Sequence, residues 1–335
     1  MRFVQFESIQ SGMVLARPVY SDSKGILAGR GIAINENVLK HLESMGVQGV
    51  YIEDSRFDDV TLEDVIKEEY RIKAYDALKA GDFNMCVSLV KAMAAEMKSH
   101  TRNDIELIDI RSFKNYEYAH SVSVAVYCIA MGLKMSMNEE QLNNLAIAAI
   151  LHDIGKFDIS SRVLNSKQIY KNRQMDEMMK HPMYSYEDLK AYPNVSAVAR
   201  NTILHHHENL DGSGYYGITA DKIGLHSRIL RVVDTYDALT STKRYRAAFT
   251  PAAAFRCIAD DAGKIYDIEV ARTFFSIAPM FPLGYTVKLD NGKAAVVIGH
   301  SADMERPVVR TFDNEVIDLS EKSNGYISVS DDIVK

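Results

Sequence analysis

The 335-residue chain has few cysteines, no excess of basic residues and no long apolar run. Cys86, Cys128 and Cys257 lie in apolar, helix-like stretches without a CxxC partner, which favours buried free thiols in a reducing compartment over disulfides. Lysine and arginine number 39 against 45 aspartates and glutamates, a net charge of -6. This balance argues against a general binder of nucleic acids or membranes, but an anionic ligand can still bind through a local basic pocket or a metal.

Signals for membranes and export are also missing. The best apolar run, Leu145–Leu151, is far shorter than the roughly 20 residues of a membrane-spanning helix. No signal peptide is visible, because Arg2 and Glu7 interrupt the start of the chain. We therefore expect a cytoplasmic protein with no DNA and no membrane among its partners.

The pattern along the chain predicts four segments and a mainly α fold. Residues 1–55 combine short strand-like runs with one helix that Asn35 can cap, which indicates a small α+β or β-rich regulatory module. Residues 56–82 are a charged, helical connector, and residues 83–278 have helical periodicity. Residues 279–335 form a short β-rich extension, in which the Asn-Gly of YTVKLDNGKAAVVIGH predicts a hairpin.

Apolar residues at helical spacing predict the helices of the central segment. Asn138 before EEQL and Thr250 before a proline mark two of the starts. The predicted helices cover residues 116–132, 138–151, 174–191, 194–206, 225–240, 251–260 and 267–277.

Histidine and aspartate gather in the middle of the chain, where seven of the ten histidines lie between positions 120 and 226. ILHDIGK places His152 beside Asp153 at the end of an apolar run, and HHHENLDG places three histidines before Glu208. Asp234 lies in the otherwise apolar stretch RILRVVDTYDALT, where an unpaired carboxylate would be costly. A set of core histidines and N-cap aspartates is the alternative, but it makes poor use of an adjacent His-Asp pair.

Imidazole and carboxylate ligands together suit Fe, Mn, Zn or Co. The available side chains exceed the needs of one ion, and Asp153 is well placed to bridge two ions. A two-metal centre would hold the attacking and leaving oxygens of a phosphate ester and would generate hydroxide at neutral pH. The residues therefore indicate metal-dependent phosphoester chemistry.

HDIGK, a later His-Pro, HHENLDGSGYYG and DTYDALTSTKRYR, in this order, resemble the HD-GYP family of bacterial phosphodiesterases that hydrolyse cyclic di-GMP. The resemblance covers about residues 115–250 and implies an HD-type helical bundle. It implies hydrolysis to linear pGpG, with GMP as a further product, by a hydroxide bridging two metals. Iron is the expected metal and manganese the next. The alternatives are a cyclic di-GMP receptor with little or no turnover and an enzyme for another cyclic dinucleotide.

The resemblance also implies the ligands of each metal. One metal would be held by His120, His152, Asp153 and Asp234. The other would be held by Asp153, His181, His206 and His207. Catalysis would involve Asp153 and Lys156, the latter near the scissile phosphate, and the ligand would be contacted by Lys243, Arg246 and Tyr215. Outer acceptors for the ligand imidazoles would come from Glu208, Asp211 and Asp237.

Asp211 has a second interpretation, since it can instead form the turn in DGSG. The sequence also departs from the HD-GYP pattern. Tyr216 replaces the proline that would stiffen the loop, a loop that, like the N-terminal module, could contact other signalling proteins. Tyr116 stands where some members have a glutamate for a third metal, and Glu117 is one residue off, so we expect two metals. Lys243-Arg244 replaces the usual Arg-Pro, which leaves ligand phosphates without that bidentate fork.

Overall fold

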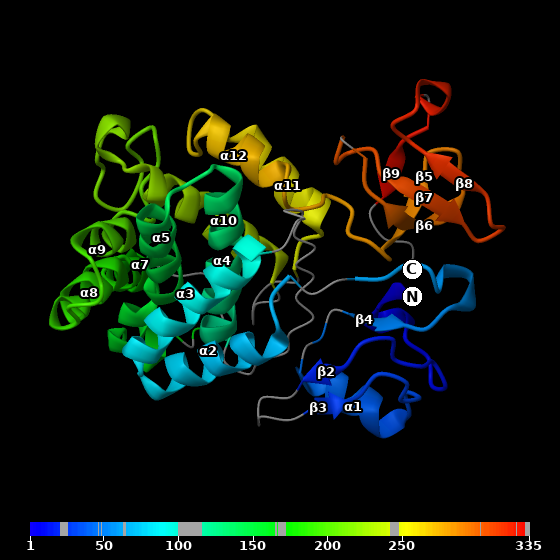
Figure 1. The fold of residues 1–335 in the computed structure, drawn as a ribbon, viewed down its shortest axis with the longest axis horizontal. Coiled ribbons are helices and arrows are strands. Elements are labelled where there is room, and N and C mark those ends of the chain that lie inside the picture. Colours follow the sequence, from blue (N-terminus) through cyan, green and yellow to red (C-terminus); the bar gives the residue numbers. More distant parts are fainter. Residues whose placement is uncertain are drawn as a thin grey trace.

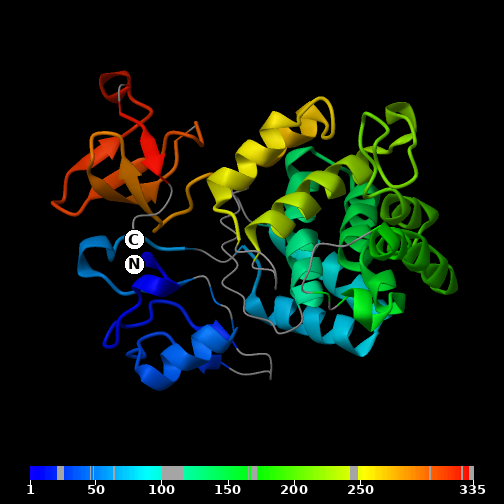
Figure 2. The ribbon, with the colours of Figure 1, turned by 180° about the vertical axis from the view of Figure 1, so that it is seen from behind.

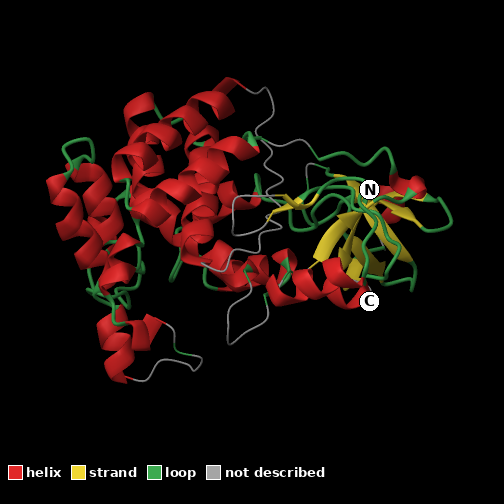
Figure 3. Cartoon of the chain, turned by 90° about the horizontal axis from the view of Figure 1, so that it is seen from below, coloured by secondary structure: helices red, strands yellow, loops and turns green. Residues whose placement is uncertain are grey.

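The computed structural model places a helical body beside a β-rich body that contains both chain ends (Figures 1 and 2). It describes residues 1–20, 26–45, 47, 49–62, 65–99, 116–164, 166, 172–241, 248–301, 303–325 and 327–331. Figure 3 shows the strands gathered at the end where both termini lie, away from most helices. This layout confirms a mainly α fold with β-rich ends.

The N-terminal unit forms around short antiparallel strand pairs. β1 (Arg2–Gln5) pairs with β4 (Gly49–Ile52), and β2 (Val19–Tyr20) pairs with β3 (Ile26–Ala28). Helix α1 (Glu36–Met45) begins where predicted, because the Asn35 side chain accepts hydrogen bonds from the amides of residues 37 and 38. The unit has its own apolar core, which includes Val4, Leu15, Ile34, Leu42 and Val50.

The C-terminal strands form one antiparallel sheet in the order β8-β7-β6-β5-β9. The predicted Asn-Gly hairpin is confirmed, since Gly292 turns with a φ of 84° and its amide donates to Leu289 between β5 and β6. The strands are β5 (Thr286–Leu289), β6 (Ala294–Gly299), β7 (Val308–Thr311), β8 (Val316–Asp318) and β9 (Val329–Asp331).

The two β-rich ends of the chain pack against each other. The ring of Phe3 stacks on Tyr285 with centroids 4.5 Å apart, and the Phe3 amide donates to the Gly284 carbonyl at 2.8 Å. Arg310 of β7 also pairs with Asp59 at 2.7 Å. The ends therefore form one composite body, which the two separate strand patterns did not predict.

The helical body surrounds α4, whose residues 119–132 are buried throughout. Helices α2, α3, α5, α10 and α12 pack against it. The main helices are α2 (Glu68–Ala80), α3 (Phe83–Ser99), α4 (Tyr116–Lys134), α5 (Glu139–Leu151), α8 (His181–Asp188), α9 (Ala197–Leu204), α10 (Leu225–Thr240), α11 (Pro251–Asp260) and α12 (Ile268–Phe275). Among the described helices, none combines the length and apolar character that a membrane crossing needs.

Several helix ends differ from the predicted ranges. The helix predicted over 174–191 is interrupted, and α7 (Asn172–Met178) ends before α8 begins with Pro182 in its first turn. Asn138 forms a complete capping box with Gln141, which confirms the start of α5. Cys86 and Cys128 are buried as predicted, but Cys257 is exposed because it lies on the outer face of α11.

Candidate metal centre

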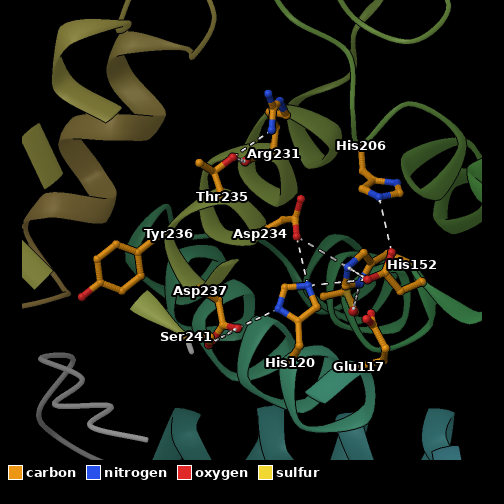
Figure 4. Close-up of polar contacts among 12 residues, drawn as sticks. Glu117, His120, His152, His206, Arg231, Asp234, Thr235, Tyr236, Asp237 and Ser241 are labelled. Carbon is orange, nitrogen blue, oxygen red and sulfur yellow. Dashed lines mark hydrogen bonds and ion pairs between the residues drawn. The ribbon is translucent and has the colours of Figure 1, made fainter. Parts of the chain in front are cut away.

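The structure brings together all seven side chains that the sequence predicts as metal ligands. They lie on α4, at the end of α5, on α8, in the turn after α9 and on α10, so helix packing gathers them. Figure 4 shows His120, His152, His206 and Asp234 among them. Ligand atoms of two sets lie within 4.8 Å of one another, namely His120, His152 and Asp234 in one and His181, His206 and His207 in the other. We call these the His120 set and the His181 set.

Asp153 lies between the two sets and presents one oxygen to each. Its Oδ2 lies 3.2 Å from His152 Nε2 and 3.6 Å from His120 Nε2. Its Oδ1 lies 3.2 Å from His181 Nε2 and 3.9 Å from His206 Nε2. This is the arrangement of a carboxylate that bridges two cations.

The cluster fits bound metal ions better than it fits a closed hydrogen-bond network. Among the described residues, His152 Nε2 and Asp153 Oδ1 are buried without a hydrogen-bond partner, which is costly unless a cation or water meets them. His181 Nε2 lies 3.3 Å from His206 Nε2, close to the roughly 3.0–3.4 Å that separates two nitrogens coordinated at about 2.1 Å. The donor set suits a transition metal without selecting one.

Hydrogen bonds at the other ring nitrogen fix how the imidazoles face the cluster. His152, His181 and His206 each donate Nδ1–H to a carbonyl three residues earlier, at 2.8, 2.7 and 2.6 Å. His120 Nδ1 instead contacts Asp237 Oδ2 at 2.7 Å. Each contact leaves Nε2 directed at the cluster, where its lone pair can bind a metal.

The electrostatics favour the protonation states that coordination requires. Burial lowers the pKa of His206 and His207 well below the usual value, and neighbouring histidines lower it further. Burial raises the pKa of the Asp153 carboxyl, but His152 and Lys156 outweigh it and hold that pKa well below its usual range. Neutral imidazoles and an ionised carboxylate are the forms that bind metal.

His120 is the exception, and it makes metal binding depend on pH. Burial lowers its pKa, but hydrogen bonds with Asp234 and Asp237 outweigh burial and raise the pKa to about 10. In the metal-free protein, this proton stabilises the fold fully below pH 6.5, and the contribution is lost as pH rises toward about 10. The same proton must leave Nε2 before that nitrogen can coordinate.

We therefore expect Mn²⁺ affinity to rise with pH, by up to about tenfold per unit between roughly pH 6.5 and 8.5. Isothermal titration in buffers of different ionisation enthalpy would report the protons released on binding. An affinity independent of pH, with no proton release, would contradict the raised pKa of His120.

Asp237 is expected to tune metal binding through His120. Asp237→Ala removes the acceptor that orients the His120 ring, and we expect metal binding at the His120 set to weaken by about 10–100-fold. Asp237→Asn keeps an acceptor oxygen and should lose less. Metal titration of both variants checks this order, and equal affinity in Asp237→Ala and the unmodified protein would remove Asp237 from the centre.

Glu208 and Asp211 do not contact the ligand imidazoles, contrary to the role predicted for them. The buried Glu208 carboxylate accepts from the Tyr216 amide at 2.8 Å and from the Ile218 amide at 3.0 Å. Asp211 accepts from the amide and hydroxyl of Ser213 and forms the turn in DGSG. Both side chains therefore shape the loop after the histidines.

The residue that replaces proline contributes to this loop. Tyr216→Pro would restore the HD-GYP pattern, yet we expect it to lower the free energy of unfolding by about 1–3 kcal/mol, because proline removes the amide that donates to Glu208. Urea unfolding measures the change, and Tyr216→Ala, which keeps the amide, is the control. A stabilised Tyr216→Pro variant would show that loop stiffness outweighs the hydrogen bond.

Tyr215 and Lys156 lie against the cluster. The Tyr215 ring lies 4.4 Å from the His207 ring, and burial raises the pKa of Tyr215 to about 12, so its hydroxyl stays protonated. Lys156 Nζ lies 2.6 Å from Asp153 Oδ2. Lys243 and Arg246, the other two residues predicted to contact the dinucleotide, fall outside the described residues.

Sequence reasoning missed two residues that hold the HD turn against α8. Ser185 Oγ donates to the His152 carbonyl at 2.9 Å and accepts from the Gly155 amide at 2.8 Å. A Cβ on Gly155 would lie 2.2 Å from the His181 carbonyl oxygen, so only glycine fits there. Ser185 lies four residues after His181, and this helical spacing is the signal that could have identified it.

The comparisons with known proteins define the class of protein. A model of the HD domain family matches residues 93–270, and the chain belongs to this family. This confirms the family indicated by the HDIGK and HHENLDG motifs.

Its curated relatives act on cyclic dinucleotides. The chain is 30% identical over 242 residues to a cyclic di-GMP phosphodiesterase of Pseudomonas aeruginosa, covering 72% of this chain and 57% of that protein. It is 30% identical over 214 residues to a cyclic di-GMP phosphodiesterase of Borreliella burgdorferi, covering 63% of this chain and 56% of that one. A 3'3'-cGAMP-specific phosphodiesterase of Vibrio cholerae is 29% identical, with coverage of 54% and 39%. The chain thus matches about half the length of these relatives.

Proposed function

We propose that this protein is a metal-dependent phosphodiesterase that hydrolyses cyclic di-GMP to linear pGpG. The observation that carries the proposal is the position of Asp153, whose two oxygens face two separate sets of ligands. Such a site suits two transition-metal ions. The resemblance to the HD-GYP family makes iron the first expectation and manganese the next. The cyclic di-GMP relatives support the choice of substrate.

Two bound metals would supply Lewis acidity and lower the pKa of a coordinated water. The protein itself contributes the geometry. Nδ1 hydrogen bonds hold the imidazoles in one orientation, and the Lys156 ammonium, at the edge of the cluster, can neutralise a phosphate oxygen. Hydrolysis adds the oxygen of water to phosphorus, breaks one P–O3′ bond and leaves a proton on the departing 3′ oxygen.

The test uses protein purified without oxygen and loaded with iron or manganese. Incubation with cyclic di-GMP should yield pGpG by chromatography, and elemental analysis should find about two metal ions per chain. Binding of cyclic di-GMP without product over long incubation would instead favour a receptor. Absence of metal, with no activity after metals are added, would refute the enzyme.

A second candidate substrate follows from the relative that is specific for 3'3'-cGAMP. Both dinucleotides present two phosphodiesters to the same metal centre, so selection between them must come from contacts to the bases. Competition between equal concentrations of the two substrates, followed by product analysis, gives the ratio of kcat/KM directly. Faster consumption of 3'3'-cGAMP would identify it, in place of cyclic di-GMP, as the substrate of the same hydrolytic reaction.

A further inference from the structure

Lys156 lies between two carboxylates that come from different elements, Asp153 in the turn after α5 and Glu117 on α4. Its Nζ lies 2.6 Å from Asp153 Oδ2 and 3.1 Å from Glu117 Oε2. Glu117 precedes His120 by three residues, so it lies one turn earlier on the same face of α4. Figure 4 shows Glu117 beside His120 at the cluster. One turn of α4 thus supplies both a metal ligand and the second partner of Lys156.

The exposed fraction of the side chain increases from Asp153 through Lys156 to Glu117. The side chain of Asp153 is 3% exposed, that of Lys156 is 17% exposed and that of Glu117 is 28% exposed. The Lys156–Glu117 pair therefore lies at a solvent-facing edge of the metal centre. An anionic substrate that reaches the cluster from this side meets the Lys156–Glu117 pair before it meets Asp153, and the Lys156 ammonium is the group of that pair that attracts it.

The two carboxylates do not hold Lys156 in the same way. Asp153 Oδ2 also faces His120 and His152. A cation bound at the His120 set would therefore be coordinated by that oxygen and would repel the positively charged Lys156 ammonium. Among the residues that the structure describes, Glu117 forms its hydrogen bond and ion pair with Lys156 alone. Because lysine has a flexible stem, its position then depends on Glu117.

We propose that Glu117 is a positioning residue that holds the Lys156 ammonium at the edge of the metal centre, where it meets a phosphate of the dinucleotide. The inference rests on the proposed function and adds to it a residue that acts through Lys156 without touching substrate. In this role, Glu117 keeps the Lys156 ammonium close to the substrate phosphate when a metal ion is bound to Oδ2 of Asp153.

A double-mutant cycle tests the coupling between the two side chains. Glu117→Gln keeps the shape and removes the charge, and Lys156→Met removes the ammonium. We expect kcat/KM for cyclic di-GMP to fall about tenfold in Glu117→Gln, and the same change to cost less than about twofold in the Lys156→Met background. Bound metal, measured by elemental analysis, should be unchanged in all four proteins. Glu117→Asp should recover part of the loss.

Glu187→Gln is the matched control, because Glu187 forms a comparable pair with Lys190 at 2.8 Å on the surface of the molecule. It should leave kcat/KM unchanged. Equal losses from Glu117→Gln in both backgrounds, or loss of metal from Glu117→Gln, would overturn the inference and assign Glu117 a ligand or structural role.

A binding measurement separates this inference from the proposed function. Equilibrium binding of cyclic di-GMP to the same four proteins gives a second cycle that needs no turnover. If the unmodified protein binds cyclic di-GMP without hydrolysing it, the proposed function fails, and a coupled cycle in Kd still supports the role of Glu117. An additive cycle, or no binding at all, would overturn that role.

Discussion

Asp153→Asn is expected to remove both metals and to lower kcat for cyclic di-GMP by at least about 1000-fold. Asp153 presents Oδ2 to His152 and Oδ1 to His181, each at 3.2 Å. Asparagine has the same size, but it carries no charge and only one oxygen, so it cannot bridge two cations. Elemental analysis of the purified variant, together with chromatography of the products, measures both losses.

Asp176→Asn is the control for this variant, because Asp176 is an exposed aspartate on α7. It should keep the metal content and turnover of the unmodified protein. Thermal unfolding of Asp153→Asn would show whether the fold survives. Two metals and normal turnover in a folded Asp153→Asn variant would refute a bridging role for this carboxylate.

Glu208→Ala is expected to lower the free energy of unfolding by about 3 kcal/mol. The side chain is 2% exposed, and its carboxylate accepts from the amides of Tyr216 and Ile218. Alanine would leave both donors without this charged acceptor, and hydrogen bonds to charged groups contribute about 1.5–3 kcal/mol each. Urea unfolding of the metal-free protein measures the change without a contribution from bound metal.

Glu208→Gln separates the charge from the shape. Glutamine keeps one acceptor oxygen but turns an amino group toward the other amide. We therefore expect its free energy of unfolding to lie between those of the unmodified protein and Glu208→Ala. Glu140→Ala, at an exposed position in the first turn of α5, is the control for a surface glutamate. Unchanged stability of Glu208→Ala would mean that water replaces the carboxylate at both amides.

The identity of the cluster could be predicted because its signals are local. His152-Asp153 and His206-His207 are adjacent pairs, and histidine beside aspartate in an apolar run has few uses other than metal binding. Helix starts with a capping residue were also predictable, as Asn138 shows.

Other features could not be predicted from local pattern. The continuous helical periodicity over 174–191 concealed the break before His181, because apolar spacing alone does not show where a chain turns. The sequence predicts that Glu208 accepts a hydrogen bond from a ligand imidazole. Its carboxylate instead accepts from backbone amides eight and ten residues later in the same loop. The contact of Phe3 with Tyr285 joins opposite ends of the chain and has no signal in either segment.

The sequence by itself determined the residue types of the candidate ligands, the family and the helical character of the central segment, because these depend on residue chemistry and on spacing within a few turns of chain. Only the tertiary structure decided how the ligands are used. It directs one oxygen of Asp153 to each set of histidines, brings Glu117 to Lys156 and joins the two β-rich ends. Each of these contacts connects different elements, so each depends on how helices and sheets pack against one another.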